Sequence, residues 1–184
     1  MNSDRSTNTP PSGGPTKDEI LAISLQKLGP TVDDICVDLG CGTGRVSIAL
    51  AGRVRMVHAV DRRREAYEWT QQEAIRMGIS NLIPHYTDAV RFLSGIEHLD
   101  IAFIGGSKDL AEVIALLHQH SVRRVVINAV MLETVNIAMK TLQKYDMFDE
   151  IVHVQVSHSY PIAEGIMFKP IDPVFIITGG CLVC

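Results

Sequence analysis

The segment Asp38-Leu-Gly-Cys-Gly-Thr-Gly44 places three glycines at alternate positions, between a short apolar run and a stretch of helical periodicity. Glycine in such a turn lets the backbone approach a ligand closely, and the unpaired N–H groups at the start of the helix face that ligand. We therefore predict a strand, a ligand-binding loop and a helix, in this order. The alternative is a tight strand-to-helix turn without a ligand.

Apolar runs of strand length alternate with helical stretches along most of the chain. The predicted strands are 35–39, 56–60, 82–86, 101–104 and 124–129, and the predicted helices are 17–28, 45–51, 64–77, 89–93, 110–118 and 132–144. Strands that are apolar on both faces and separated by helices indicate a parallel sheet covered on both sides. Two further runs, 150–156 and 174–178, are joined by a loop without a helix and predict an antiparallel hairpin. This α/β, three-layer, Rossmann-like layout of seven mostly parallel strands resembles the class I methyltransferase fold.

Length and charge limit the classes of protein to which this chain can belong. With 184 residues and 46% hydrophobic content, the chain can bury one sizeable core but not two enzyme domains. Its 17 basic and 21 acidic residues create no overall positive field, so we predict no nucleic-acid partner. No apolar run reaches the roughly 18 residues of a membrane helix, and the N-terminus lacks a signal-peptide pattern. We therefore predict a cytoplasmic protein without a membrane partner.

The two ends of the chain differ in composition from its centre. Residues 1–14 are rich in Ser, Thr, Asn, Pro and Gly, which predicts a flexible tail. One domain is expected over 15–180, followed by a C-terminal tail over 181–184. Thr16 and Glu19 form the pattern of a capping box at the start of the first helix.

Four cysteines are present, and their positions are not typical of a secreted disulfide framework. Cys36 lies in an apolar run and Cys41 in the glycine loop, so reduced thiols are predicted. Cys181 and Cys184 form a C-x-x-C pair that could hold a metal or a redox disulfide. Because no second Cys or His pair has zinc-ligand spacing, we predict no protein-bound metal.

The residue after the last glycine of the loop distinguishes between two classes of ligand. The dinucleotide pattern G-x-G-x-x-G requires glycine at the position of Arg45, which disfavours a pyrophosphate ligand and a nicotinamide oxidoreductase. S-Adenosylmethionine has no phosphate, and Asp38-x-Gly-x-Gly resembles motif I of the methyltransferases that use it. That resemblance implies that Asp38 lies near the amino group of the cofactor. It also implies cofactor contacts from the loop residues Gly40, Cys41, Gly42, Thr43 and Gly44.

Carboxylates follow the second and third predicted strands. Asp61 lies about 20 residues after the loop, where a carboxylate can accept hydrogen bonds from both ribose hydroxyls. Its alternative role is to cap the next helix, and the two roles are compatible. Asp88 and Ala89 follow the third strand, where the methyltransferase resemblance implies a contact with adenine. Asp88 is equally consistent with a helix cap alone.

Several further landmarks together resemble one family. They are Gly14-Pro15-Thr16, Arg45-Val46, Leu50 to Val54, Val60-Asp61-Arg62, Gly105-Gly106-Ser107, Leu132-Glu133-Thr134 and Pro173-Val174. Over residues 13–180 the chain is similar to the decarboxylating cobalt-precorrin-6B C15-methyltransferases of cobalamin biosynthesis, CbiT. The resemblance implies methylation of C15 and loss of the C12 (ring C) acetate as carbon dioxide, which gives cobalt-precorrin-7. It also implies a corrinoid tetrapyrrole as partner, a homotetramer, and a cofactor contact from Thr16.

The substrate side of the site carries fewer signals. Gly105-Gly106-Ser107 stands where amine methyltransferases have an Asn-Pro-Pro-Tyr type of sequence, which disfavours a base-methylating enzyme and leaves room for a bulky substrate. Glu133, His158 and Tyr160 are candidate catalytic or substrate residues, although a carboxylate at a helix start is favourable without such a role. The relatives are arginine-rich near His158 and Tyr160. Either these two residues replace arginine by hydrogen bonding, or the substrate has changed.

The basic triplet Arg62–Arg64 opposes the dipole of the predicted helix that follows it and therefore indicates a partner charge. We interpret it as a solvated surface or a subunit contact, with a substrate carboxylate as the alternative. Four other histidines are interpreted as structural or surface residues: His85, His118, His120 and His153.

Two rival functions make different predictions. Another class I methyltransferase, acting on RNA or a small molecule, would bind S-adenosylmethionine but no corrinoid. A non-catalytic nucleotide-binding or assembly module would keep the fold without methyl transfer, and the intact loop together with Asp61 disfavours it. The family resemblance implies a corrinoid C-methyltransferase, and these two functions remain its alternatives.

Overall fold

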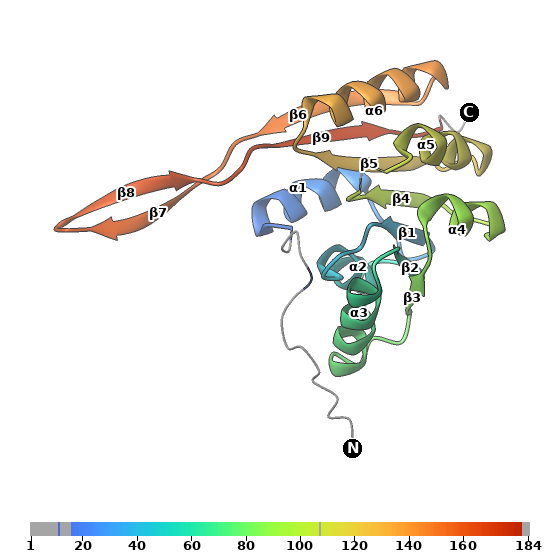
Figure 1. Cartoon of the computed structure of the whole chain (residues 1–184), viewed down its shortest axis with the longest axis horizontal. Helices are drawn as coiled ribbons and strands as arrows, with labels where there is room; N and C mark the ends of the chain where they lie inside the picture. The colour runs from blue at the N-terminus through green and yellow to red at the C-terminus, as the bar shows by residue number, and fades with distance from the viewer. Residues whose placement is uncertain (1–10, 12–15, 107, 182–184) are drawn as a thin grey trace.

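The computed structural model describes residues 11, 16–106 and 108–181, which form six helices and nine strands (Figure 1). The helices are α1 Asp18–Leu28, α2 Arg45–Ala51, α3 Arg64–Arg76, α4 Ala89–Gly95, α5 Leu110–Gln119 and α6 Leu132–Lys144. The strands are β1 Ile35–Leu39, β2 Met56–Asp61, β3 Leu82–Tyr86, β4 Ile101–Ile104, β5 Arg124–Ala129, β6 Phe148–Val154, β7 Ser157–Ile162, β8 Gly165–Pro170 and β9 Val174–Gly179. From β1 to α6 the strands and helices alternate as the apolar runs predict.

Seven strands form one sheet in the order β3-β2-β1-β4-β5-β9-β6. Strands β1 to β5 pair with one another in parallel. Strand β9 runs antiparallel between β5 and β6, as expected for the closing strand pair. The predicted fold class, a mostly parallel seven-stranded sheet with an antiparallel C-terminal pair, is confirmed.

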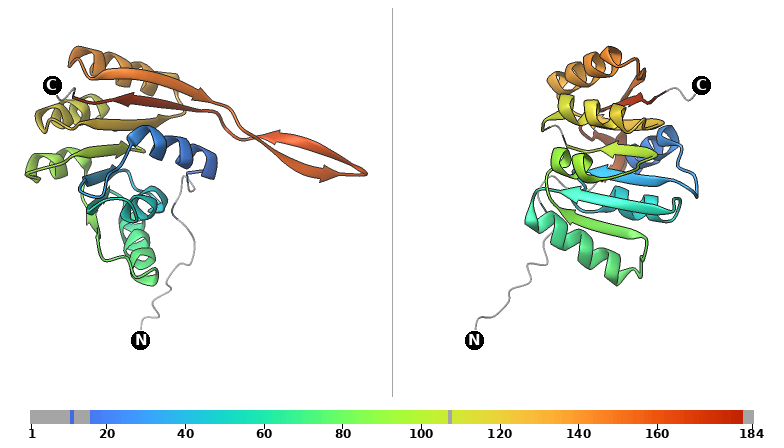
Figure 2. Two further views of the ribbon diagram at one scale, coloured as in Figure 1. Left: turned by 180° about the vertical axis from the view of Figure 1, so that it is seen from behind. Right: turned by 90° about the vertical axis from the view of Figure 1, so that its right-hand side faces the viewer.

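Helices cover both faces of the sheet (Figure 2). On one face α1, α2 and α3 pack through residues such as Ile20 and Leu50. On the other face α4, α5 and α6 pack through residues such as Ile114 and Leu142. Each fully buried leucine or isoleucine side chain contributes about 1.5–3 kcal/mol to stability. The central strands read as continuous apolar runs because they are covered on both sides.

The strand order reverses beside β1, and this reversal positions the functional site. After β3 the chain returns across the sheet, so that β4 pairs with the edge of β1 opposite to β2. In open α/β sheets a crevice forms at the carboxyl ends of the strands that flank such a switch point. The glycine loop after β1 and the Gly105-Gly106 turn after β4 meet there.

The segment between β6 and β9 differs from the prediction of a plain loop. Residues 157–170, which we call the arm, form a second antiparallel hairpin made of β7 and β8. Every residue of both strands is exposed, and the arm projects away from the sheet (Figures 1 and 2). The predicted strand 150–156 is also shifted, since β6 begins at Phe148 and ends at Val154.

The start of α1 also differs from the prediction. The helix begins at Asp18, and its N-cap residue Lys17 makes no side-chain cap hydrogen bond. The predicted capping box of Thr16 and Glu19 is therefore wrong. The side chain of Glu19 contacts the arm instead of capping the helix, since its Oε1 lies 3.5 Å from Nε2 of His158.

Both predicted tails fall largely outside the described residues. Of residues 1–14 only Pro11 is described, and of residues 181–184 only Cys181. The limits of the domain therefore stay a prediction. Within the described part of the chain, no helix has the length and apolar character needed to cross a membrane.

Candidate active site

A pocket of about 740 Å³ opens at the carboxyl ends of β1, β2 and β4. Pockets of roughly 300–1,000 Å³ are typical of small-ligand sites. It is lined by these predicted site residues: Thr16, Asp38, Gly40, Cys41, Gly42, Thr43, Asp61, Asp88, Ala89, Gly105 and Gly106. Gly44 lies next to the lining, and Ser107 lies outside the described residues.

The glycine loop has a backbone conformation that requires glycine. Gly40, Gly42 and Gly44 have φ angles of +80°, +56° and +72°, in the left-handed region that other residues rarely adopt. A Cβ atom on Gly40 would lie 2.9 Å from the backbone nitrogen of Gly106. A Cβ atom on Gly44 would lie 2.9 Å from Oγ1 of Thr70. The loop therefore packs directly against the turn after β4 and against α3, with no space for a side chain at Gly40 or Gly44.

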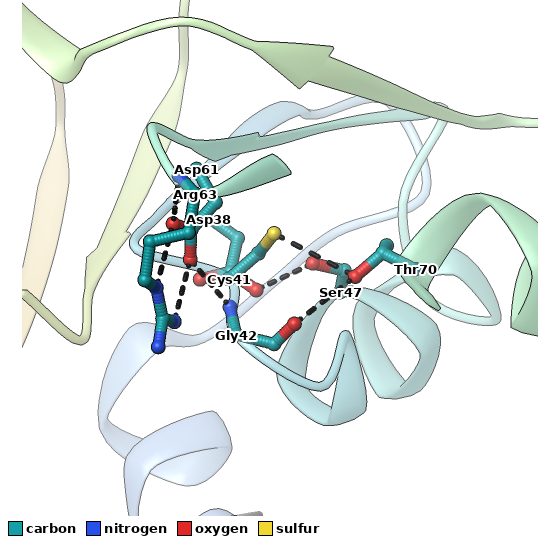
Figure 3. A network of polar contacts seen from close by, with 7 residues as sticks. All are labelled: Asp38, Cys41, Gly42, Ser47, Asp61, Arg63 and Thr70. Atoms are coloured by element: carbon teal, nitrogen blue, oxygen red, sulfur yellow. Dashed lines mark hydrogen bonds and ion pairs between the residues drawn. The ribbon is translucent and has the colours of Figure 1, made fainter. Parts of the chain in front are cut away.

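Asp38 is a buried carboxylate at the base of the loop (Figure 3). It is 1% exposed, and its Oδ2 accepts a hydrogen bond from the hydroxyl of Ser47. Its Oδ1 has no hydrogen-bond partner among the described residues. Burial raises the pKa of Asp38 to about 7, although the hydrogen bonds from Ser47 lower it. An ionised carboxylate in this position is stabilised by a nearby cation, so Asp38 suits a ligand that carries an amino group.

The raised pKa of Asp38 predicts a pH-dependent stability. The folded protein retains a proton that the unfolded chain loses above about pH 4, so stability falls as the pH rises toward 7. When the pH rises from about 5 to about 8, titration of Asp38 is expected to lower the free energy of unfolding by about 2–3 kcal/mol. The variant Asp38→Asn has no carboxyl group at this position, so this pH-dependent loss of stability should be absent from it.

Chemical denaturation at both pH values measures this effect in the absence of ligand. Asp172→Asn is the control, because Asp172 is an exposed carboxylate that lines the same pocket. If Asp38→Asn and wild type lose equal stability between the two pH values, the buried carboxylate does not titrate as described.

Asp61, at the end of β2, accepts four hydrogen bonds (Figure 3). Oδ1 accepts from the backbone nitrogen of Arg63 at 2.9 Å and from its Nε at 3.1 Å. Oδ2 accepts from the backbone nitrogen of Gly42 at 3.0 Å and from Nη2 of Arg63 at 2.9 Å. Burial raises the pKa of Asp61, but the bonds from Arg63 and Gly42 outweigh it and hold the pKa below its ordinary value. Asp61 is not the N-cap of α3, which is Arg63.

Asp88 combines a structural role with a position in the pocket. It is the N-cap of α4, and its side chain accepts a hydrogen bond from the backbone nitrogen of Arg91 at 2.9 Å. The predicted helix cap is thus confirmed. Asp88 and Ala89 both line the pocket beside the end of β3, where their predicted contact with adenine would be made.

The buried thiols are not poised as nucleophiles. Sγ of Cys41 lies 3.7 Å from Oγ1 of Thr70, and burial raises the pKa of Cys41 far above its ordinary value. Burial likewise raises the pKa of Cys36. Cys181 is a free thiol, whereas Cys184 lies outside the described residues. No group of three or more His, Cys, Asp or Glu side chains in the described residues is arranged to hold a metal ion.

Comparison with known proteins shows the family to which the chain belongs. Residues 11–179 match the model of the precorrin methyltransferase domain. The chain belongs to the precorrin methyltransferase family. A Methanosarcina mazei protein named probable cobalt-precorrin-6B C(15)-methyltransferase (decarboxylating) is 43% identical over 173 residues, which cover 91% of this chain and 94% of that relative.

Two solved structures resemble this precorrin methyltransferase over nearly its whole length. Precorrin-8W decarboxylase from Methanobacterium thermoautotrophicum is 34% identical with a TM-score of 0.85, covering 91% of this chain and 92% of its own. Precorrin-6y C5,15-methyltransferase from Geobacter metallireducens is 26% identical with a TM-score of 0.87, covering 98% of both chains. The predicted family, enzyme class and fold class are therefore confirmed.

The three candidate catalytic residues of this precorrin methyltransferase do not line the pocket. Glu133 is exposed in the first turn of α6. His158 lies on β7 and faces α1 through Glu19, while the hydroxyl of Tyr160 lies 3.9 Å from Sδ of Met167 on β8. Their catalytic roles stay predictions.

The histidines interpreted as structural make local contacts. The contacts are His85 with His58 at 3.0 Å, His120 with the carbonyl of Leu93 at 2.8 Å, and ring stacking of His118 on Tyr145 and of His153 on Phe175. Burial lowers the pKa of His58 to about 4 and also lowers that of His85. This pair is therefore neutral near pH 7.

The sequence offered Arg62–Arg64 as a substrate carboxylate site only as an alternative and gave no other cationic residue a place in the pocket. Five cationic residues line it: Lys17, Arg45, Arg62, Arg63 and Lys108. Arg45 also donates a hydrogen bond to Asp18, which joins the start of α1 to the glycine loop. Two sequence signals pointed toward this group. One was the arginine at the third-glycine position, and the other was the basic triplet after Asp61. The partner charges of that triplet include carboxylates of the same chain, since Arg64 pairs with Glu68.

Proposed function

We propose that this chain transfers a methyl group from S-adenosylmethionine to C15 of cobalt-precorrin-6B and removes the ring C acetate carboxylate as carbon dioxide, giving cobalt-precorrin-7. One observation carries the proposal. A member of the precorrin methyltransferase family retains a complete glycine loop, with Asp38 and Asp61, around a pocket of about 740 Å³. The substrate is taken from the name of the relative that shares 43% identity.

The pocket residues fit S-adenosylmethionine. Oδ1 of Asp38, which has no hydrogen-bond partner among the described residues, suits the amino group. Asp61 offers two carboxylate oxygens to the ribose hydroxyls, and Asp88 with Ala89 lies where adenine would be held. Thr16, two residues before α1, also lines the pocket. When bound, the cofactor supplies an electrophilic methyl group on its sulfonium.

The chain would promote methyl transfer by alignment. Gly40, Gly105 and Gly106 leave the ends of β1 and β4 without side chains, and the last two are exposed. A flat, bulky macrocycle can therefore approach the pocket from this side. An enamine-like ring carbon is nucleophilic without a strong base, so holding it in line with the methyl group supplies much of the catalysis.

Decarboxylation requires the chain to hold a carboxylate and to deliver a proton. The bond between the acetate methylene and its carboxylate breaks, the electron pair passes into the conjugated ring, and a proton is added to the methylene carbon. Lys17 and Lys108 line the pocket and could hold carboxylate arms by charge. His158 and Tyr160 lie on the arm outside the pocket lining and stay candidates for the proton donor.

Anaerobic incubation with methyl-labelled S-adenosylmethionine tests the proposal, with cobalt-precorrin-6B in one sample and total RNA in another. We expect label in the macrocycle and release of carbon dioxide only from the first sample. Labelled RNA with an unlabelled macrocycle would instead favour the RNA-modifying alternative. Cofactor binding without transfer to any acceptor would favour the non-catalytic module.

We also propose that the chain forms a homo-oligomer, in line with the tetramer that the family resemblance implies. An isolated two-stranded hairpin is only marginally stable in water, and apolar side chains on exposed strands favour pairing with another chain. The arm exposes a set of large apolar side chains: Tyr160, Ile162, Ile166, Met167 and Phe168. Arms of neighbouring copies packed on one another would bury this set.

Charged residues on the arm should disrupt the oligomer. Ile166 and Phe168 are 72% and 67% exposed and lie on the same face of β8. Replacing both by Asp is expected to weaken self-association at least about 100-fold, because each buried apolar side chain contributes about 1.5–3 kcal/mol. Sedimentation velocity measures the result, with Lys169→Ser as a control on the same strand. A monomeric wild type would contradict the proposal. Unchanged self-association of the double variant would show that the copies do not contact each other through the arm.

A further inference from the structure

The guanidinium of Arg63 engages both oxygens of the carboxylate that the proposed function assigns to ribose. Nε bonds Oδ1 of Asp61 and Nη2 bonds Oδ2, at 3.1 and 2.9 Å. Figure 3 shows the side chain folded back over the end of β2, beside the glycine loop. A Cβ atom on Gly42 would lie 3.6 Å from Nη2, so the guanidinium also lies close to the loop.

The acceptor positions of Asp61 leave no place for further donors. A carboxylate offers about four lone-pair positions. Two are taken by backbone nitrogens of Arg63 and Gly42, and the other two by the guanidinium. The backbone donors belong to the loop and the start of α3, which the fold holds in place. Ribose hydroxyls can therefore reach Asp61 only by replacing the guanidinium.

The two groups are chemically equivalent as partners for Asp61. A guanidinium presents two N–H donors in a fixed fork that matches a carboxylate. The 2′ and 3′ hydroxyls of ribose present two neighbouring O–H donors to the same two oxygens. The side chain of Arg63 is 34% exposed, so solvent can hydrate the guanidinium when it leaves Asp61.

We propose that Arg63 is an internal competitor for the cofactor ribose, which holds Asp61 until the two hydroxyls displace it. The inference rests on the proposed use of S-adenosylmethionine. It makes Arg63 a determinant of cofactor affinity although it forms no bond to the bound ribose. It also gives one residue of the basic triplet a role, since Arg63 neutralises this buried carboxylate before the cofactor binds.

Calorimetric titration with S-adenosylhomocysteine tests the proposal without turnover. The sulfur of this ligand is uncharged, so a gain in affinity does not come from reduced repulsion of a sulfonium. Arg63→Gln is expected to bind it about threefold to tenfold more tightly than wild type, as expected for loss of one partly exposed ion pair. Arg63→Lys keeps the positive charge but not the two-pronged geometry of the guanidinium, so its affinity should lie between those of wild type and Arg63→Gln.

A double-mutant cycle distinguishes competition from other roles. In an Asp61→Asn background the change at Arg63 is expected to alter affinity less than about twofold, because the contested carboxylate is gone. Arg62→Gln is the matched control, since Arg62 lies in the same triplet, lines the pocket and makes no hydrogen bond to Asp61. In ¹⁵N spectra, the Nε resonance of Arg63 should move toward its solvent-exposed position when ligand is added.

Equal gains from Arg62→Gln and Arg63→Gln would overturn the proposal in favour of a general charge effect. Unchanged or weaker binding by Arg63→Gln would also overturn it and would leave the proposed cofactor intact. Failure of wild type to bind S-adenosylhomocysteine at all would contradict the proposed function itself.

Discussion

Asp61→Asn is expected to weaken the binding of S-adenosylhomocysteine about 100-fold, the loss for about 3 kcal/mol of hydrogen bonding. The carboxylate is 4% exposed, and its pKa is held below the ordinary value by Arg63 and Gly42 in spite of burial. It is therefore ionised near neutral pH and can form charge-assisted bonds with both ribose hydroxyls. Asparagine keeps the shape but loses the charge and one acceptor oxygen.

Isothermal titration measures this loss, and thermal unfolding checks that the variant is folded. Asp172→Asn is the matched control, because it makes the same chemical change at an exposed position of the same pocket. We expect its affinity to stay within about twofold of wild type, as is usual for an exposed substitution. Unchanged affinity of a folded Asp61→Asn variant would show that Asp61 does not bind the ribose.

Gly40→Ala is expected to lower the free energy of unfolding by about 2–4 kcal/mol and to abolish tight cofactor binding. Gly40 has a φ angle of +80°, and an added Cβ would lie 2.9 Å from the nitrogen and 3.2 Å from the Cα of Gly106. Both contacts are with backbone, so the loop and the turn after β4 must separate. That separation would move the walls that hold the ligand.

Gly52→Ala provides the control for this change. Gly52 has a φ angle of −77°, and no atom lies within 4 Å of its added Cβ. We expect a change of no more than about 0.5 kcal/mol, or a slight gain from the less flexible unfolded chain. Denaturant titration and ligand titration of both variants measure the difference. Similar stability of the two variants would show that the loop tolerates a side chain at Gly40.

Periodicity predicted the strands and helices of the sheet well, because burial on both faces makes β1, β4 and β5 continuous apolar runs. The arm was missed for the opposite reason. Its residues are exposed on both faces, so no alternation marks a buried side. Its turn, Ala163–Glu164, also lacks the Asn-Gly type of signal, although Ala163 adopts a φ angle of +47°.

Residues whose role depends on local backbone were predictable, and residues whose role depends on tertiary contact were not. Asp88 caps α4 as its position before an apolar stretch indicated. In contrast, no local signal could show that Arg45 would pair with Asp18, 27 residues earlier in the chain. The same holds for Glu19, whose expected cap is replaced by a contact with the arm.

In the candidate site, too, some residues could be predicted from the sequence and others depend on tertiary packing. The glycine loop and the carboxylates after β1, β2 and β3 converge because parallel strands present their carboxyl ends at one edge of the sheet. The cationic residues come from the starts of α1 and α2 and from turns, and tertiary packing sets how these segments approach the pocket. Positions on the arm, such as His158, could not be placed relative to the pocket from the sequence alone.

The most direct test of the assigned activity follows both products of the reaction in one anaerobic sample. The sample contains S-adenosylmethionine with a ¹³C methyl group and cobalt-precorrin-6B with a labelled ring C acetate carboxylate, and Asp61→Asn is run in parallel. The proposed function predicts a ¹³C methyl resonance on C15 and an equal amount of labelled carbon dioxide from wild type, with both strongly reduced in the variant. An unmethylated C15 after complete incubation with folded wild-type protein would contradict it.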